Sequence, residues 1–524
     1  MKKHTLVIAA LSMILFTGCS TNNAQTSPKI IQTKATSSPH VILLVVDSLM
    51  DKPLKNAIKQ HKAPALEFFL TNGQYSKELV SSYPTMSVTI DSTLLTGTNP
   101  DKHKIPGLVW YKEDEQRVIS YGNGFLETLK YGVTDIADNS LSQFNNKDLS
   151  KDVQTIHEDL DERGKQTASI NALIYRGNYQ HTLVVPKILA KTTALPDKYK
   201  TNGPKILTLG DFINQDPKNK HVINRLGIND AFGAQELTYL LKNNLLPEFT
   251  ILYLPENDHA VHRKGTETID GIEKLDKHLQ EILNTYPKWD DALENTMWII
   301  MGDGNQSDVI KNKKKALIHL RDTLSDYNQL KLGDSAQKNN EIAITANERM
   351  AYIYKLNKGI SIKKIANKLQ TDPRIAWIAW KENDMVNVIS ESGKGILQFK
   401  PGGPFKDRYH QNWTIKGNMD ILDVKADSRK QLSYGNYPDG LSRLYGAIYS
   451  QKGDFLIADA EPGYEFLGES SPEHTGGGAH GSMHKVDAYA PLIVTGTEHS
   501  IDQLRIVDMK RWILEILDGG NMQD

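Results

Sequence analysis

An unbroken apolar run at residues 41–46 is the feature that most restricts the fold of this chain. The run reads Val-Ile-Leu-Leu-Val-Val and ends at Asp47. Continuous rather than alternating apolarity is typical of a strand that is buried on both faces, as in a parallel sheet covered by helices. Similar runs recur at residues 249–254, 297–301, 455–457 and 491–494. The sequence therefore predicts several buried strands of one sheet.

Helical patterns lie between these runs, for example at residues 266–283 and 504–517. The second pattern places Ile506, Met509 and Ile513 on one apolar face. Alternating strands and helices predict an α/β fold with a doubly wound, mostly parallel sheet that is flanked by helices. In such sheets the ligand site lies beyond the carboxyl ends of the strands.

Residues 349–447 have a different pattern. Two strand-like runs surround a helical pattern and are followed by a hairpin-like segment that turns at Ser-Gly-Lys-Gly. In chain order these segments are residues 350–356, 362–369, 375–380 and 385–399. We therefore predict a smaller α+β cap at residues 349–447, inserted into a main domain that spans residues 40–524.

The amino-terminal segment has the pattern of an export signal. Lys2 and Lys3 precede an apolar run at residues 6–16, which is too short to span a bilayer. The run ends in Leu-Phe-Thr-Gly-Cys at residues 15–19, a string that resembles a bacterial lipoprotein box. Cys19 is then the residue that receives the lipid.

This interpretation predicts where the protein is located. Residues 1–18 would be a lipoprotein signal peptide, and residues 19–39, rich in Ser, Thr, Asn and Gln, would form a flexible tether. The mature protein would be extracytoplasmic and anchored to the cell membrane through Cys19. The alternative is a plain secretory signal with an incidental cysteine. Because the chain has a single cysteine, an intramolecular disulfide is excluded.

The charge balance excludes one class of partner. The chain has 62 Lys and Arg residues against 63 Asp and Glu residues, for a formal net charge of −1. Proteins that bind nucleic acid without sequence specificity neutralise phosphates with a positive surface. We therefore expect no nucleic-acid binding.

Polar residues with metal-binding side chains collect where the predicted strands end. Each of these residues alone could be a helix N-cap or a loop carboxylate with satisfied hydrogen bonds. Together, Asp and His side chains at several strand ends of one sheet suit a metal site with oxygen and nitrogen ligands. The residues are Asp47, Asp258, His262, Asp303, His480 and His484.

Residues 83–107 carry a resemblance to a known family. The segment, YPTMSVTIDSTLLTGTNPDKHKIPG, resembles the nucleophile helix of type I phosphodiesterase/nucleotide pyrophosphatases in the alkaline phosphatase superfamily. The family's other motifs follow in the same order along the chain. They are Val-Val-Asp at 45–47, Asp-x-x-x-His at 258–262, Gly-Asp-Gly-Asn-Gln at 302–306 and Ala-His-Gly-Ser at 479–482.

The resemblance implies a catalytic domain with two divalent cations. Asp258, His262 and His480 would hold one ion, for which zinc is expected. Asp47, Asp303 and the nucleophile oxygen would hold the other, which could be Zn, Mn or Mg. Two cations about 4 Å apart can bracket a phosphoryl group. The implied substrate is a small phosphoester.

Two hydroxyls could be the nucleophile, Ser87 and Thr85. Thr-Leu-Leu-Thr-Gly at residues 93–97 resembles the family's Thr-Leu-Val-Thr-Gly, and counting back from it selects Ser87. Thr85 is the runner-up, with an alternative role as a helix N-cap.

The chain departs from the family pattern at two positions. The family histidine that follows the third aspartate is Gly304 here, and the asparagine three residues after the nucleophile is Ile90. The first change removes a nitrogen ligand from the second cation. Asn305, His474 or His484 could supply the missing donor.

These features predict a surface-anchored, metal-dependent phosphoesterase that prefers diesters by family likeness. The alternative is a degenerate, non-catalytic envelope lipoprotein that keeps the fold and one metal. Gly304 favours the alternative, whereas Ser87 and the remaining ligands favour the enzyme.

Overall fold

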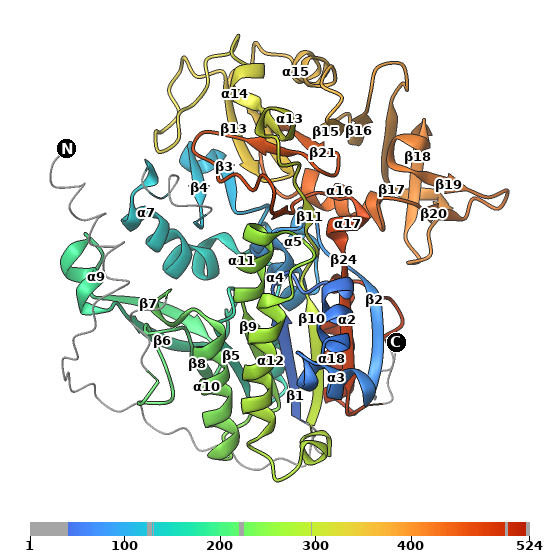
Figure 1. Cartoon of the computed structure of the whole chain (residues 1–524). Helices are drawn as coiled ribbons and strands as arrows, with labels where there is room; N and C mark the ends of the chain where they lie inside the picture. Colours follow the sequence, from blue (N-terminus) through green and yellow to red (C-terminus); the bar gives the residue numbers. More distant parts are fainter. Residues whose placement is uncertain are drawn as a thin grey trace.

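The computed structural model describes residues 40–122, 128, 130–219, 225–294, 296–497 and 501–519. The predicted signal peptide, the tether and Cys19 therefore lie outside the described residues. Within them, two seven-stranded sheets dominate, one in the lower half of Figure 1 and the other in its upper half, where it extends to the right.

The first sheet contains four of the five buried strands that the sequence predicts. Its strand order is β2 (Gly73–Val80), β24 (Tyr489–Thr495), β10 (Thr296–Gly302), β1 (His40–Val46), β9 (Phe249–Leu254), β5 (Thr167–Ile170) and β8 (Ile206–Thr208). Strands β10, β1, β9, β5 and β8 pair in parallel, and β24 is antiparallel to both of its neighbours. The prediction of a mostly parallel sheet is confirmed.

Helices cover both faces of this sheet, so successive residues of β1 point into different cores. Val41, Leu43 and Val45 pack in a cluster with α4 (Ser87–Thr96), α8 (Ile156–Glu162) and α18 (Ile506–Leu517). Ile42, Leu44 and Val46 pack in another cluster. That cluster includes side chains from α2 (Asp51–Lys59), α3 (Pro64–Thr71), α10 (Asp230–Lys242) and α12 (Asp270–Leu283). Each of these buried side chains contributes about 2 kcal/mol of hydrophobic stabilisation, which explains the unbroken apolar run.

The second sheet is antiparallel throughout and carries the predicted hairpin. Its order is β13 (Ile342–Asn347), β14 (Met350–Lys355), β21 (Asp454–Ala460), β15 (Ile375–Glu382), β16 (Met385–Ile389), β17 (Leu397–Lys406) and β18 (Asn412–Gly417). Val386 of β16 lies opposite Phe399 of β17, as a hairpin requires. One face packs against α15 (Ile362–Leu369), and the other packs against α16 (Gly440–Ile448).

One strand assignment from the sequence is wrong. The run at residues 455–457 belongs to β21, in the middle of the antiparallel sheet, and not to the parallel sheet. Phe455 and Ile457 face one core while Leu456 faces the other, so β21 is buried on both faces. Unbroken apolarity therefore reports burial on two sides rather than strand direction. Both β13 and β21 lie outside the interval 349–447 that the sequence predicts for the cap.

Smaller elements complete the described structure. Five two-stranded pairs are β3 (Val109–Lys112) with β4 (Arg117–Ser120), β6 (Tyr179–Val184) with β7 (Lys198–Gly203), β11 (Ser307–Asp308) with β23 (Gly478–Ala479), β12 (Leu317–His319) with β22 (Glu465–Leu467), and β19 (Val424–Ala426) with β20 (Leu432–Tyr434). The short helices are α5 (Pro100–His103), α7 (Val133–Asp138), α9 (Lys187–Thr192), α11 (Glu256–Lys264), α13 (Lys313–Ala316), α14 (Leu320–Thr323) and α17 (Lys485–Ala488).

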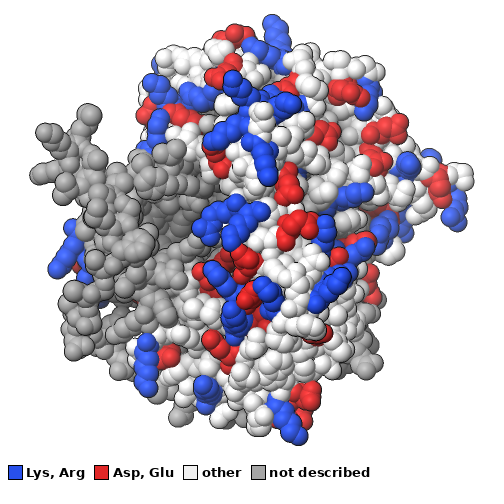
Figure 2. Space-filling view, in the orientation of Figure 1, with Lys and Arg blue, Asp and Glu red and all other residues white. Residues whose placement is uncertain are grey.

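The surface has no extended field of one charge on the face that Figure 2 shows. Lys and Arg side chains are interspersed with Asp and Glu side chains over its visible part, in keeping with the net charge of −1. In the described part of the chain, no helix combines the length and apolarity that crossing a membrane requires.

Candidate functional site

Neighbouring parallel strands bring the predicted site residues to one edge of the first sheet. Asp47 follows β1, Asp303 follows β10, and α11, directly after β9, carries Asp258 and His262. Ser48 connects two of these positions. Its backbone N–H donates to Asp303 Oδ1 at 2.9 Å, and its hydroxyl donates to Asp258 Oδ1 at 2.9 Å.

The first ligand group consists of Asp258, His262 and His480, whose possible ligand atoms all lie within 4.8 Å of one another. His262 Nδ1 donates to the carbonyl of Gly478 at 2.8 Å, and His480 Nδ1 donates to the carbonyl of Thr85. The Nε2 atoms of both rings therefore face Asp258 Oδ1, at 3.1 Å from His262 and 3.8 Å from His480. These hydrogen bonds fix the orientation of the rings, and the tautomer that donates from Nδ1 leaves Nε2 available as a metal ligand.

Charge interactions within this group are strong. Burial alone would raise the pKa of Asp258, but the charges of His262 and His480 hold it well below its ordinary value. Burial lowers the pKa of His262, and the negative charges of Asp258 and Glu348 outweigh this effect and raise the pKa to about 10. In the absence of a metal, the carboxylates therefore favour a positive charge at this position.

Glu348 was missed by the sequence analysis. It lies in the turn between β13 and β14, is only 7% exposed, and places Oε1 at 3.8 Å from His262 Nε2 and 3.7 Å from His480 Nε2. The ring of His474 is tilted by 32° against that of His262, with centroids 4.3 Å apart, and its Nδ1 lies 3.0 Å from Glu465 Oε2. His262, Glu348 and His474 also satisfy the distance requirement for a metal-binding group. No local pattern marks a buried glutamate in a strand turn, so the sequence carried no signal for it.

The second ligand group surrounds the start of α4. Ser87 is the first residue of this helix, and its hydroxyl donates to Asp47 Oδ2 at 3.4 Å. The Tyr253 hydroxyl donates to the same oxygen. The first backbone N–H groups of a helix have no intrahelical partner, and they can therefore bind an anion. The predicted nucleophile thus lies beside a buried carboxylate and an anion-binding helix terminus.

A further carboxylate, Asp91, lies one helical turn after Ser87. It is 1% exposed, and within the described residues neither of its oxygens has a hydrogen-bond partner. Burial raises the pKa of Asp91 above its ordinary value, and the charge of Asp303 raises it further. Burial likewise raises the pKa of Asp47, with additional contributions from Asp303, Asp258 and Asp91. Several carboxylates buried with few donors fit a site that a cation neutralises.

Thr85 is engaged in a structural role. Its hydroxyl accepts a hydrogen bond from Gly481 N at 2.7 Å and donates to Ser482 O at 3.2 Å. These two hydrogen bonds connect the segment that carries His480 to the residues just before α4. The expectation that Thr85 is a helix N-cap is wrong, because Met86 occupies the N-cap position of α4 and no side chain caps it.

The structure places the proposed replacements for the family histidine in different surroundings. A Cβ at Gly304 would lie 3.2 Å from the carbonyl oxygen of Asp487. Asn305 donates its N–H to that oxygen at 2.8 Å, and its Oδ1 is buried without a partner among the described residues. His474 lies beside the first ligand group, against the ring of His262. His484 caps α17 by accepting from Val486 N at 3.3 Å.

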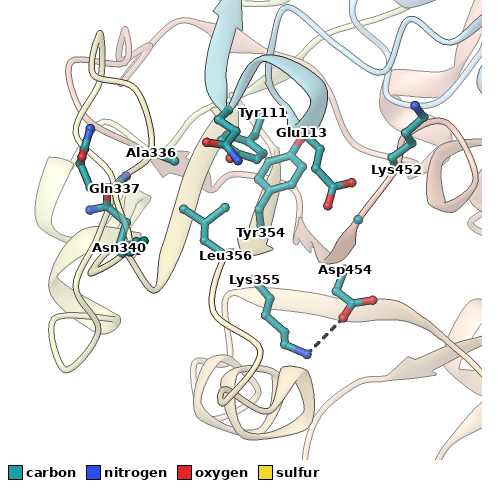
Figure 3. Close-up of a pocket in the computed structure, with 13 residues that line it drawn as sticks. Tyr111, Glu113, Ala336, Gln337, Asn340, Tyr354, Lys355, Leu356, Lys452 and Asp454 are labelled. Carbon is teal, nitrogen blue, oxygen red and sulfur yellow. Dashed lines mark hydrogen bonds and ion pairs between the residues drawn. The ribbon is translucent and has the colours of Figure 1, made fainter.

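The site is separate from a pocket of about 430 Å³ near the second sheet. Tyr111, Tyr354 and Lys452 lie around this pocket, and Lys355 forms an ion pair with Asp454 in it (Figure 3). None of the predicted ligands lines it. The predicted ligands therefore lie together outside this pocket.

Solved structures of ectonucleotide pyrophosphatase/phosphodiesterase 5 share this fold. The murine protein matches with a TM-score of 0.54 and 12% identity over 91% of this chain and 95% of its own chain. An inactive murine variant in complex with AMP matches with a TM-score of 0.53, 12% identity and coverages of 92% and 95%. The human protein matches with a TM-score of 0.54, 13% identity and coverages of 91% and 95%. No curated protein sequence matches the chain.

The match to a family model shows to which family the chain belongs. The model described as type I phosphodiesterase / nucleotide pyrophosphatase matches residues 41–483. This range begins within β1 and ends just after His480, so it includes all the motifs that carry the resemblance. The chain therefore belongs to the type I phosphodiesterase/nucleotide pyrophosphatase family and is a hydrolase that acts on phosphoester bonds.

Proposed function

We propose that the protein is a metal-dependent phosphodiesterase that uses Ser87 as its nucleophile and acts on the outer side of the cell membrane. One observation carries the proposal: Ser87 begins α4 at 3.4 Å from Asp47, at the sheet edge where both ligand groups lie. A hydroxyl in this position can reach a phosphorus atom whose oxygens are held by the helix N-terminus.

The donor sets fit divalent cations. Asp258, His262 and His480 offer one carboxylate and two imidazole nitrogens, a combination that suits zinc. Asp47, Asp303 and Ser87 offer only oxygen donors, and such sites suit Mg or Mn. When bound, the two cations would lower the pKa of the Ser87 hydroxyl and neutralise charge on the transferred phosphoryl group and the leaving oxygen.

The protein's own residues would then perform a two-step displacement. Ser87 Oγ forms a bond to phosphorus while the bond from phosphorus to the leaving oxygen breaks. Asp47 orients the Ser87 hydroxyl through their hydrogen bond. The Ser87 hydroxyl gives up its proton, the leaving oxygen takes one up, and the rest of the substrate stays attached to Ser87 Oγ through phosphorus. A water molecule then displaces Ser87 Oγ, which regains a proton, and the phosphomonoester is released.

A small phosphoester is the substrate class that fits the family. A structurally similar murine protein was solved in complex with AMP, which supports a nucleotide-sized ligand. A diester is preferred over a monoester by family likeness.

A panel of p-nitrophenyl substrates tests this function. The purified protein should release p-nitrophenol from a diester faster than from the monoester, and only with added Zn, Mn or Mg. A chelator should abolish the activity, since the hydroxyl of Ser87 is a weak nucleophile without a metal. Metal binding without turnover of any substrate would instead support a non-catalytic binding protein of the same fold.

The proposed location is tested by Cys19→Ser. A serine at this position lacks the thiol that the lipid modifies, so the variant should leave the membrane fraction or remain unprocessed. Immunoblots of membrane and soluble fractions measure the outcome, with Ser20→Ala as the matched control. Membrane fractionation equal to that of the unmodified protein would count against the anchor.

A further inference from the structure

Glu348 adds a fourth donor atom close to the first ligand group. Asp258 Oδ1 lies 3.1 Å from His262 Nε2 and 3.8 Å from His480 Nε2. Glu348 Oε1 lies 3.8 Å from His262 Nε2 and 3.7 Å from His480 Nε2. In a tetrahedral zinc site with bonds of 2.0–2.1 Å, the donors are separated by about 3.4 Å. The four separations between a histidine nitrogen and a carboxylate oxygen, 3.1 to 3.8 Å, lie near this value.

The tautomer of the two histidines favours a cation between their Nε2 atoms and the two carboxylates. Both rings donate from Nδ1 to backbone carbonyls, His262 to Gly478 and His480 to Thr85. In a neutral ring the Nε2 atom then presents a lone pair, and both of these lone pairs face carboxylate oxygens. Two lone pairs and two negative charges repel one another unless a positive charge lies between them.

Glu348 is held rigidly in the orientation that a ligand needs. Its Oε2 accepts the backbone N–H of His480 at 3.0 Å, and its carbonyl accepts the N–H of Phe466 at 2.7 Å. The next residue, Arg349, donates its N–H to the carbonyl of His480 at 2.9 Å, and its buried guanidinium pairs with Asp487. Glu348 has a φ of 54°, which is uncommon for a residue other than glycine. The surrounding contacts therefore maintain a conformation that costs about 1 kcal/mol or more.

We propose that Glu348 Oε1 is a fourth protein ligand of the first cation, in addition to Asp258, His262 and His480. This inference rests on the proposed function, because it assigns a ligand within the first of the two metal sites. Catalytic zinc sites commonly have three protein ligands and an open position, whereas four protein ligands close the coordination shell. A phosphate oxygen would then have to displace Glu348 or enter as an additional ligand. Glu348 thus strengthens the binding of the metal and restricts the access of the substrate to it.

Glu348→Gln is the principal test. The amide keeps the size of the side chain but removes the negative charge and weakens the oxygen as a ligand. Zinc affinity, measured by competition with a chromophoric chelator, should fall at least about tenfold. The visible absorption of cobalt bound in place of zinc should change, since it responds to the ligand set. Glu281→Gln, on the exposed face of α12, is the matched control and should leave both measurements unchanged.

A purely structural role of Glu348 predicts a different outcome. If Glu348 only accepts hydrogen bonds and pairs with protonated histidines, Glu348→Gln lowers the melting temperature of the metal-free protein but leaves zinc affinity unchanged. That result would overturn the proposal. If the Gln variant does not fold, Glu348→Asp applies the same test, because it keeps the charge and withdraws the oxygen from the cation. If Glu348→Gln weakens zinc binding and the unmodified protein hydrolyses no diester, Glu348 is a metal ligand but the proposed phosphodiesterase function is refuted.

Discussion

Replacing Ser87 with alanine should abolish diester hydrolysis, with kcat falling on the order of 10⁴-fold or more. The alanine removes the oxygen that the proposed mechanism attaches to phosphorus. The fold should be unaffected, because within the described residues the hydroxyl of Ser87 makes a single hydrogen bond, to Asp47 at 3.4 Å. Steady-state kinetics with a p-nitrophenyl diester measure the loss. Mass spectrometry of quenched reactions should find the phosphoryl group, with its remaining ester group, on the peptide that contains Ser87 in the unmodified protein only.

Thr85→Ala is the matched control for this prediction. The Thr85 hydroxyl is buried between Gly481 N and Ser482 O, so its removal should cost about 1 kcal/mol of stability for each hydrogen bond lost. Activity should fall much less than in Ser87→Ala, through a small displacement of the His480 segment. If Thr85→Ala were inactive and Ser87→Ala active, the assignment of the nucleophile would be wrong.

The main sheet could be predicted from the sequence because burial on both faces leaves a direct pattern. All residues of β1 after His40 are buried, as the unbroken run at residues 41–46 indicates. The same pattern was misleading at β21, which packs between two cores of the antiparallel sheet. Apolarity records how many faces of a strand are covered. It does not record which sheet the strand joins, because that depends on contacts with distant segments.

The site could be predicted where its residues follow strand ends. Asp47 and Asp303 come directly after β1 and β10, which pair in parallel, so their proximity follows from the fold. Glu348 and Asp91 could not be predicted in this way. Glu348 reaches the site from the turn of another sheet, through contact with His480, which lies 132 positions away in the chain. Asp91 looks like an ordinary helical carboxylate until its burial without a partner is known.

The two cations should be held with very different affinities. Exhaustive dialysis should leave about one tightly bound ion per chain, because the first ligand group combines imidazole nitrogens with carboxylates. The second group, with Gly304 in place of the family histidine, offers the oxygens of Asp47, Asp303 and Ser87, and oxygen-only sites exchange their ions more readily. The dialysed protein should be almost inactive, and Mn or Mg should restore turnover. Elemental analysis and kinetics on the same samples measure both effects.

Variants in each ligand group test which group holds the tightly bound ion and which holds the exchangeable one. His262→Ala should lose the ion that survives dialysis, because it removes a nitrogen donor at the centre of the first group. Asp303→Asn should retain that ion but require far more Mn or Mg for activity, since it removes a carboxylate only from the second group. Two equally tight zinc ions in the unmodified protein would contradict the asymmetry. They would imply that another buried donor, such as the unpaired Oδ1 of Asn305 or the carboxylate of Asp91, compensates for the absent histidine.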